Sequence, residues 1–252
     1  MDIAILVGLF VIATLYSSVG HGGASGYLAI LSLTIYASED PLWLKQHAWS
    51  LNLVVAGIAF FMYKKNEYFN YKIAFPLIIA SLPAAFFGGY LKVDNQIYDT
   101  LLSLTLMFAA WKLYSVKTPI DDGLITHIPE KKWLFLMGVI IGLLSGIIGV
   151  GGGIFLSPLL LLFKWSDVKT TAGISALFIW VNSASGLVGS SLSGEFVLDF
   201  DTLLPFTLAV VTGGFIGSKL GAERFNQNVV KYLLVAVLII ASVRQIIGLL
   251  GL

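Results

Sequence analysis

The sequence predicts an all-α membrane protein made of two inverted repeats, each with a broken or re-entrant pair of short helices and three transmembrane helices. Composition is the first reason: 58% of the residues are hydrophobic and 12% are charged, whereas soluble domains carry roughly 25% charged residues. The second is a set of apolar segments close to the roughly 20 residues that cross a bilayer. The third is a glycine-broken segment that occurs twice, at 20–23 and at 149–152. The chain is therefore expected to lie in a lipid bilayer.

The repeat extends beyond the glycines. The longest polar stretch, at about 112–132, lies where one repeat ends and the next begins. We therefore expect a first transmembrane repeat at 1–116, an inter-repeat loop at 117–130 and a second transmembrane repeat at 131–252. The offset of 129 positions that relates the glycine clusters also relates Pro76 to Pro205, Phe86 to Phe215, Gly88 to Gly217 and Leu91 to Leu220.

The predicted helices follow in chain order. Six apolar segments are long enough to cross the bilayer: 41–63, 71–92, 97–116, 167–190, 201–221 and 227–248. Four others are shorter: 3–19, 23–37, 133–148 and 151–163. At ~1.5 Å per residue these reach about 20–25 Å, which is less than the ~30 Å hydrocarbon core. Each short pair is expected to meet at its glycines, either as a re-entrant hairpin or as a broken span.

Charges in the connecting loops predict the orientation, because cytoplasmic loops of membrane proteins are enriched in Lys and Arg. Loop 64–72 contains Lys64, Lys65 and Lys72, while its counterpart 191–201 contains acidic residues and no basic one. We expect the first loop on the inside and the second on the outside. This opposition gives the two repeats inverted orientations and places both termini outside.

The two glycine clusters form the predicted substrate-binding site. Adjacent glycines make a poor helix, and a membrane tolerates broken backbone only where it is buried in protein or lines a cavity. Interrupted helices at matching places in two repeats point to the binding site of a transporter, and free N–H groups at helix ends bind anions. His21 also has a simpler interpretation, as a neutral histidine bonded to a carbonyl. The residues assigned to the site are Gly20, His21, Gly22, Gly23, Ser25, Gly149, Gly151, Gly152 and Gly153.

Other glycines recur every four residues and are predicted to bring membrane helices together instead. This pattern indicates close packing of backbones rather than a contact with substrate. The glycines concerned are Gly138, Gly142 and Gly146 in one segment and Gly213, Gly217 and Gly221 in another.

Polar side chains within the predicted spans are few. Asn52 and Asn182 are nearly equivalent in the repeats and lie close to the expected midplane. Each is expected either to bind substrate or to tie helices together. Gln46 and His47 lie nearer the outer end of their helix and are assigned to a vestibule. No Asp or Glu lies in the middle of a predicted span, which argues against a proton relay or sodium site made of carboxylates.

Several other functions are disfavoured. The net charge of +1 gives no reason to expect nucleic acid, and the absence of cysteine excludes disulfides and thiol chemistry. Neither glycine cluster continues into the Gly-Lys-Ser/Thr of a phosphate-binding loop, and we expect no cofactor, no metal ion and no catalytic residue. One enzymatic alternative stays open. Residues 23–26 read Gly-Ala-Ser-Gly, so that Ser25 would be the nucleophile of an intramembrane serine hydrolase and His47 its base.

The chain resembles the TauE/SafE family of sulfite exporters, also called the 4-toluene sulfonate uptake permease family. The residues that carry the resemblance are 149–153 followed by Ser-Pro-Leu-Leu at 157–160, with a weaker copy at 20–23. The first copy departs from the second, because Ala24 stands opposite Gly153 and Ala29 opposite Pro158. The resemblance covers essentially the whole chain. It implies a multi-pass protein of the cell inner membrane that exports sulfite or small sulfonates.

The function expected from these observations is export of a small sulfur oxyanion by alternating access, in a protein that is not an enzyme. An anion channel with the same pore is the main alternative, and a hydrolase built on Ser25 is a weaker one. The expected partners are sulfite or a related small anion and the lipid bilayer. The sequence does not define the oligomeric state.

Overall fold

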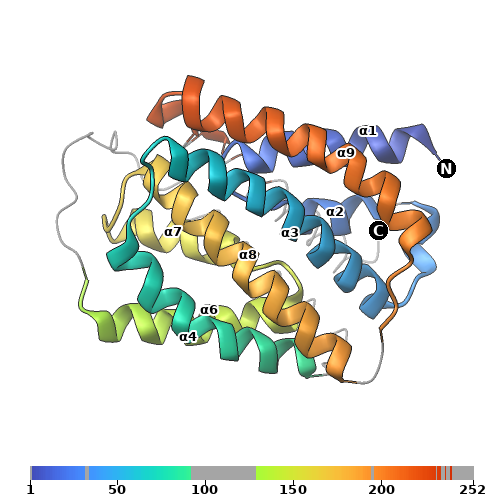
Figure 1. Cartoon of the computed structure of the whole chain (residues 1–252), viewed down its shortest axis with the longest axis horizontal. Coiled ribbons are helices and arrows are strands. Elements are labelled where there is room, and N and C mark those ends of the chain that lie inside the picture. Colours follow the sequence, from blue (N-terminus) through green and yellow to red (C-terminus); the bar gives the residue numbers. More distant parts are fainter. Residues whose placement is uncertain are drawn as a thin grey trace.

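The computed structural model of the chain describes four long stretches and four single positions. In these residues every regular element is a helix and none is a strand, which confirms the predicted all-α class (Figure 1). The expected span at 97–116, and most of that at 227–248, lie outside the described residues. The described residues are 2–31, 34–91, 129–193 and 196–230, together with 232, 233, 236 and 239.

Within its described residues, the first half of the chain contains α-helices and one short 3-10 helix. Asp40 caps the longest helix, because its carboxylate accepts the N–H of Leu42 at 2.7 Å. The expected segment 23–37 is not one helix, because the N–H and the hydroxyl of Thr34 both donate to the carbonyl of Leu31 and close the first helix there. The elements are α1 (Ile3–Ser17), α2 (Ala24–Leu31), η1 (Ile35–Ser38), α3 (Pro41–Lys65) and α4 (Tyr71–Tyr90).

The second half repeats this order of short and long helices. Four segments of the described chain are long and apolar enough to cross a membrane: α4, α6, α8 and the continuous segment Phe200–Arg224. Helix α3 is as long as α8, at 25 residues, but more polar. The elements are α6 (Lys131–Ile148), α7 (Gly153–Leu162), α8 (Val168–Leu192), α9 (Phe200–Lys219) and the π-helical turn η2 (Leu220–Arg224) that continues α9.

Helices α3 and α8 lie side by side and run in opposite directions (Figure 1). Near the start of α3, the amide of Gln46 donates to the hydroxyl of Ser190 near the end of α8 at 3.1 Å. Further along α3, the amide of Asn52 donates to the hydroxyl of Ser183 at 3.2 Å. Since the order reverses between the two helices, they are antiparallel, and each half of the chain contributes one of them.

The other long helices pack across the two halves in parallel pairs. Helix α4 packs on α6, and α9 packs on α1. Along α6, Gly138 and then Gly146 lie against Leu77 and then Ala85 of α4. Along α9, Gly213 and then Gly217 lie against Phe10 and then Thr14 of α1, so that the order is the same on both helices of each pair. Helices α1, α3 and α9 therefore run in one direction, and α4, α6 and α8 run in the other (Figure 1).

The glycines spaced four residues apart pack helices together, as the sequence predicts. A β-carbon on Gly142 would stand 2.5 Å from the backbone oxygen of Ser81, so only glycine permits this approach. The equivalent glycines of the other pair face backbone carbonyls of α1 and the residue after it. The contacts join Gly138, Gly142 and Gly146 to α4, Gly213 and Gly217 to α1, and Gly221 to the carbonyl of Ser18.

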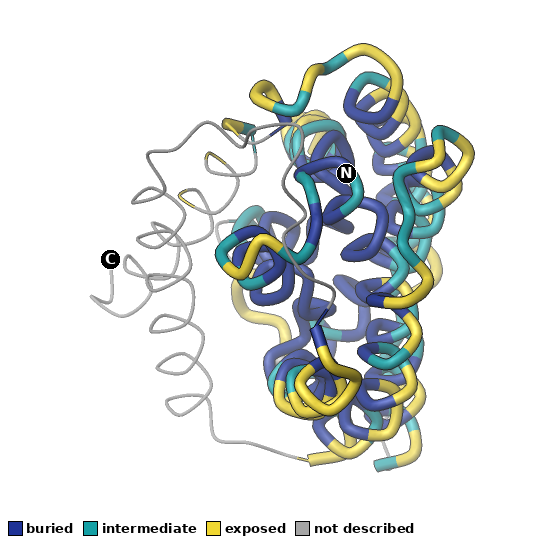
Figure 2. Tube along the Cα trace, turned by 90° about the vertical axis from the view of Figure 1, so that its left-hand side faces the viewer, coloured by how far each residue is buried: buried dark blue, intermediate teal, exposed yellow. Residues whose placement is uncertain are grey.

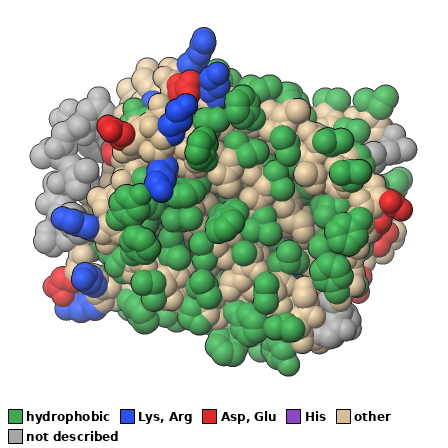
Figure 3. Space-filling model, viewed as in Figure 1, with side chains coloured by type: hydrophobic (Ala, Val, Ile, Leu, Met, Phe, Trp, Pro, Cys, Tyr) green, Lys and Arg blue, Asp and Glu red, His purple; other side chains and the backbone are tan. Residues whose placement is uncertain are grey.

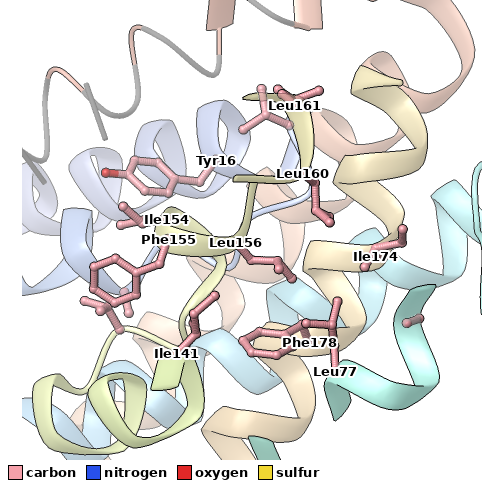
Figure 4. Packing of buried hydrophobic residues seen from close by; sticks show 14 of the residues in the cluster. Tyr16, Leu77, Ile141, Ile154, Phe155, Leu156, Leu160, Leu161, Ile174 and Phe178 are labelled. Carbon is pink, nitrogen blue, oxygen red and sulfur yellow. The ribbon is translucent and has the colours of Figure 1, made fainter. Parts of the chain in front are cut away.

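An apolar cluster anchors the short helix α7 between the longer ones. Phe155 of α7 and Phe178 of α8 are buried in it beside Ile141 of α6 and Leu77 of α4 (Figure 4). Lipid tails are as apolar as these side chains, so in a bilayer the cluster is stabilised by close van der Waals packing rather than by removal from water. Buried residues lie toward the middle of the helix array and exposed ones toward its rim (Figure 2). The start of α7 is thus held in a fixed place.

Charged side chains gather at the two ends of the molecule, and hydrophobic ones cover the face between them (Figure 3). One end contains the last turn of α3 and the first turns of α4, α6 and α8, and it is rich in lysine. The opposite end contains the first turns of α1, α3 and α9, and it is rich in acidic residues. The lysines of the first end are Lys64, Lys65, Lys72, Lys131, Lys132, Lys164, Lys169 and Lys219, which outnumber the acidic Glu67, Glu130, Asp167 and Glu223 there. The acidic residues of the opposite end are Asp2, Glu39, Asp40, Asp199 and Asp201.

Candidate functional site

Two breaks interrupt the short helix pairs, and both are built on glycines in the left-handed region of backbone conformation. The first break joins α1 to α2 and the second joins α6 to α7. Residues with side chains rarely adopt this conformation, so glycine is needed at these positions. The backbone φ angles are +75° at Gly20, +102° at Gly23, +86° at Gly149, +75° at Gly151 and +83° at Gly152. We call residues 18–23 the first glycine loop and residues 149–152 the second glycine loop.

The two loops meet at Asn52 of α3 and Ile179 of α8. The side chain of Asn52 occupies the space where Gly22 would carry a β-carbon. A β-carbon on Gly151 would stand 2.8 Å from Cγ2 of Ile179 and 2.9 Å from Nδ2 of Asn52. Gly153, the first residue of α7, also lies against Ile179. The fold therefore brings together predicted site residues that are 129 or more positions apart in sequence.

Asn52 holds this meeting point together. Its Oδ1 accepts the N–H of Ala24, the first residue of α2, at 2.9 Å, and its Nδ2 donates to the hydroxyl of Ser183 on α8. The side chain is fully buried. Asn52 therefore ties helices together, which is one of the two alternatives offered by the sequence, and its binding of substrate stays a prediction.

His21 connects the first glycine loop to α7 and α8. The carbonyl of Val19 lies 3.1 Å from Nδ1, and because a carbonyl only accepts, Nδ1 carries the hydrogen. Nε2 lies 3.5 Å from the hydroxyl of Ser157 in α7, which is itself 2.8 Å from the hydroxyl of Ser175 in α8. The ring is buried and passes beside Gly153. The histidine thus sits between the two breaks in a bonding pattern that suits its neutral form.

Helix α7 begins at the second glycine loop without a side-chain cap. Its N-cap is Gly152, whose backbone carbonyl accepts the N–H groups of Phe155 and Leu156 but which has no side chain to bond the donors before them. Helix α2 begins at the first loop, where Asn52 takes one donor. Helix N-termini carry a partial positive charge, roughly half an elementary charge each. Two such ends starting beside the same asparagine form an arrangement that favours a small anion.

Ser25 and Tyr27 shape the start of α2. The hydroxyl of Ser25 lies 3.0 Å from that of Tyr16 in α1. The hydroxyl of Tyr27 donates to the carbonyl of Gly22 at 2.7 Å. Both interactions are buried and fix the first glycine loop against its own helices.

The remaining predicted residues lie along α3 and α8 away from the loops. Asn182 donates to the carbonyl of Phe178 at 2.8 Å. Among the described residues its Oδ1 has no hydrogen-bond partner, and no hydrogen bond joins Asn182 to either glycine loop. Ser183, one position further along, makes the contact with Asn52 instead.

Gln46 and His47 are buried and tie α3 to the segment before α9. The Oε1 of Gln46 accepts the N–H of Val197 at 3.0 Å. The Nε2 of His47 accepts the N–H of Asp199 at 3.2 Å, while its Nδ1 donates to the carbonyl of Trp43 at 2.8 Å. These bonds place both side chains at the acidic end of the molecule, nearer that end than Asn52.

Sequence reasoning missed several residues that line the meeting point. Ile179 and Ser183 are one turn apart on α8, and this spacing would have placed both on one face. Lys45 was not assigned to the site, yet its stem lies 3.0 Å from the β-carbon position of Gly149. Within the described ranges, no group of three or more His, Asp or Glu side chains is placed to hold a metal ion.

The fold and the site define a multi-pass helical membrane protein with two interrupted helix pairs, and comparisons with known proteins agree. Residues 4–245 match the family described as Sulfite exporter TauE/SafE. The chain is 30% identical over 246 residues to a protein of Sinorhizobium fredii named as a probable membrane transporter protein, with 96% of this chain and 97% of that protein covered.

Two further relatives have the same description. The chain is 29% identical over 238 residues to a probable membrane transporter protein of Methanocaldococcus jannaschii, covering 91% of this chain and 87% of that protein. It is 28% identical over 248 residues to one of Bacillus subtilis, covering 88% of each. No solved structure matches the chain. The chain belongs to the TauE/SafE family, as the glycine motifs predicted.

Proposed function

We propose that the protein exports a small sulfur oxyanion, sulfite or a small organosulfonate, across the cell inner membrane by alternating access. The observation that carries this proposal is the meeting of the two glycine loops at Asn52. A ligand there would receive N–H donors from the start of α7, which has no side-chain cap. Charge-assisted hydrogen bonds from such donors bind an anion without an arginine or lysine. The family description as sulfite exporters supports the choice of sulfur oxyanion.

Alternating access is proposed because the helix directions support inverted repeats. Three helices of the first half run opposite to their counterparts in the second: α1 to α6, α3 to α8 and α4 to α9. The contacts between the halves are related by the same repeat: α4 contacts α6, and the counterpart of α4, which is α9, contacts the counterpart of α6, which is α1. Inverted repeats allow one bundle to rock against the other around a site fixed between them.

The charge distribution supports an orientation of the protein in the membrane. The lysine-rich end of the molecule corresponds to the cytoplasmic side, because cytoplasmic loops are enriched in Lys and Arg. In this orientation the N-terminus lies outside, with the start of α3. A substrate anion enters from the lysine-rich end and leaves at the acidic end.

The contacts favour transport over hydrolysis. A serine hydrolase needs its nucleophile within hydrogen-bond reach of a base. The hydroxyl of Ser25 is paired with that of Tyr16, and both ring nitrogens of His47 bond to backbone groups of Trp43 and Asp199. An anion channel remains the alternative that the experiment must separate from a carrier.

Counterflow of labelled sulfite tests the proposal. Purified protein in proteoliposomes loaded with unlabelled sulfite is diluted into a trace of radiolabelled sulfite. A carrier accumulates the label transiently and shows initial rates that saturate with concentration. The absence of any sulfite flux would reject the substrate, and flux without saturation or counterflow would identify a channel. Ser25→Ala serves as a control, because a hydrolase would lose all activity, whereas transport should only weaken.

A further inference from the structure

Trp49 of α3 carries a buried donor with no acceptor. Its side chain is only 1% exposed, and among the described residues its indole Nε1–H has no hydrogen-bond partner. The indole group can donate but cannot accept. Buried polar groups are nearly always paired, so an unpaired donor calls for a missing acceptor.

The position of Trp49 relates this donor to the meeting point of the glycine loops. Trp49 precedes Asn52 by three residues, so the two side chains are neighbours on one face of α3. Gly186 lies on α8, one turn beyond Ser183, and it faces Trp49 of α3. A β-carbon on Gly186 would stand 3.0 Å from Cζ2 and 3.2 Å from Cε2 of the indole. Nε1 is bonded to Cε2, so the N–H edge lies in the α3–α8 seam, one turn from the Asn52–Ser183 bond.

The same face of α3 carries a positive charge further toward the acidic end. Lys45 precedes Trp49 by four residues, and its stem lies against Gly149 in the second glycine loop. Lys45, Trp49 and Asn52 therefore form a row on α3, spaced one turn apart. The row starts at the meeting point of the loops and leads toward the end that contains Asp40.

We propose that Trp49 is a substrate-binding residue: its indole N–H donates to the transported anion as the anion passes from the glycine loops toward Lys45. This inference rests on the proposed function and extends it by one named donor and by the α3–α8 seam as the route outward. The ligand class follows from the chemistry of the row. An indole N–H, an amide N–H and an ammonium group all suit an oxyanion with unprotonated oxygens.

The test is the affinity of the purified protein for sulfite after Trp49→Phe. This change removes the N–H and keeps an aromatic ring in the core. Trp180→Phe is the matched control, because Trp180 lies on α8 and is 43% exposed. Isothermal titration with sulfite should show affinity lowered at least about tenfold in Trp49→Phe, the usual effect of one lost hydrogen bond to a charged group. The control should bind like the wild type.

A second variant keeps the test decisive if Trp49→Phe does not elute as a folded protein in size-exclusion chromatography. Gly186→Ala adds a methyl group against the indole edge and should lower affinity in the same direction. Wild-type affinity in a folded Trp49→Phe variant would mean that the indole N–H does not bind substrate. If Trp49→Phe does not fold, wild-type affinity in Gly186→Ala would mean the same. Failure of the wild type itself to bind sulfite or small sulfonates would reject the proposed function, and this inference with it.

Discussion

At the scale of single residues, one asparagine organises the candidate site. Asn52 caps α2, bonds to α8 and touches both glycine loops. The sequence singles out Asn52 and the glycines as candidate site residues, because an amide within an apolar span and adjacent glycines in a membrane segment are both energetically costly. That they bind substrate stays a prediction. It could not show that Ser183 rather than Asn182 completes the contact. That choice depends on the rotation of α8 about its own axis, which packing against α3 and α4 decides.

Replacing Asn52 by leucine should disable the site. The change removes the cap on Ala24 and the bond to Ser183, at a cost of about 1–3 kcal/mol in the free energy of unfolding. Sulfite affinity should fall at least about tenfold, since charge-assisted hydrogen bonds contribute 1.4 kcal/mol or more. Asn182→Leu is the matched control and should bind nearly normally, because Asn182 bonds only within its own helix. The reverse ranking of the two variants in a titration would place the substrate at Asn182.

Gly151→Ala should also abolish binding. Alanine would have to adopt the left-handed conformation at φ +75°, and its methyl group would press on Ile179 and Asn52. Gly57→Ala tests whether a methyl group on α3 is harmful in general. Its nearest neighbour is Trp180 at 3.3 Å, and alanine is about 1 kcal/mol better than glycine inside a helix. Equal loss of sulfite binding in both variants would remove the special role of the second glycine loop.

At the scale of helices, periodic glycines decide which elements touch. Their four-residue spacing predicted close packing from sequence, and the contacts of α6 with α4 and of α9 with α1 confirm it. The partners were not predictable, because the same pattern suits any helix with small residues. The break in the expected segment 23–37 was also missed. Thr34 ends α2 through local bonds to the backbone, and hydropathy does not report such bonds.

Gly142→Ala should destabilise the protein by forcing α4 and α6 apart. The added β-carbon would stand 2.5 Å from the carbonyl oxygen and 2.7 Å from Cα of Ser81. Overpacking of this kind costs about 1–3 kcal/mol, so the unfolding temperature in detergent should fall by several degrees. Gly8→Ala is the control, since its nearest neighbour is the flexible end of Ile30 at 3.0 Å. An unchanged melting temperature for Gly142→Ala would show that the two helices are not in contact at this point.

At the scale of the whole molecule, the helix directions and the distribution of charge both support opposite orientations of the two halves. The elements of the two halves run in opposite directions, and the lysine-rich and acidic ends lie at opposite poles (Figure 3). Loop charges alone predict inverted repeats, although each charge difference is small, and the inversion stays a prediction. The sequence could not show how the halves interlock, because the contacts between α4 and α6 and between α1 and α9 join distant parts of the chain.

Thiol labelling of intact cells tests this orientation, and the native chain has no cysteine to interfere. Glu67 follows α3 at the lysine-rich end, and Asp201 lies in the first turn of α9 at the acidic end; both are exposed. An impermeant reagent should label Asp201→Cys and should leave Glu67→Cys unmodified until the cells are permeabilised. Labelling of both sites to the same extent in intact cells would contradict the inverted arrangement.

The central claim, that the anion binds where the two glycine loops meet, is tested most directly by locating the anion. Selenite has the pyramidal shape of sulfite and, as a dianion, the same charge, and its selenium atom gives anomalous X-ray scattering. Crystals of the protein soaked in selenite should show one anomalous peak between Gly22 and Gly151, within hydrogen-bonding distance of Nδ2 of Asn52. The peak should disappear in Asn52→Leu crystals. A peak elsewhere in the protein, with none between the glycine loops, would contradict the account.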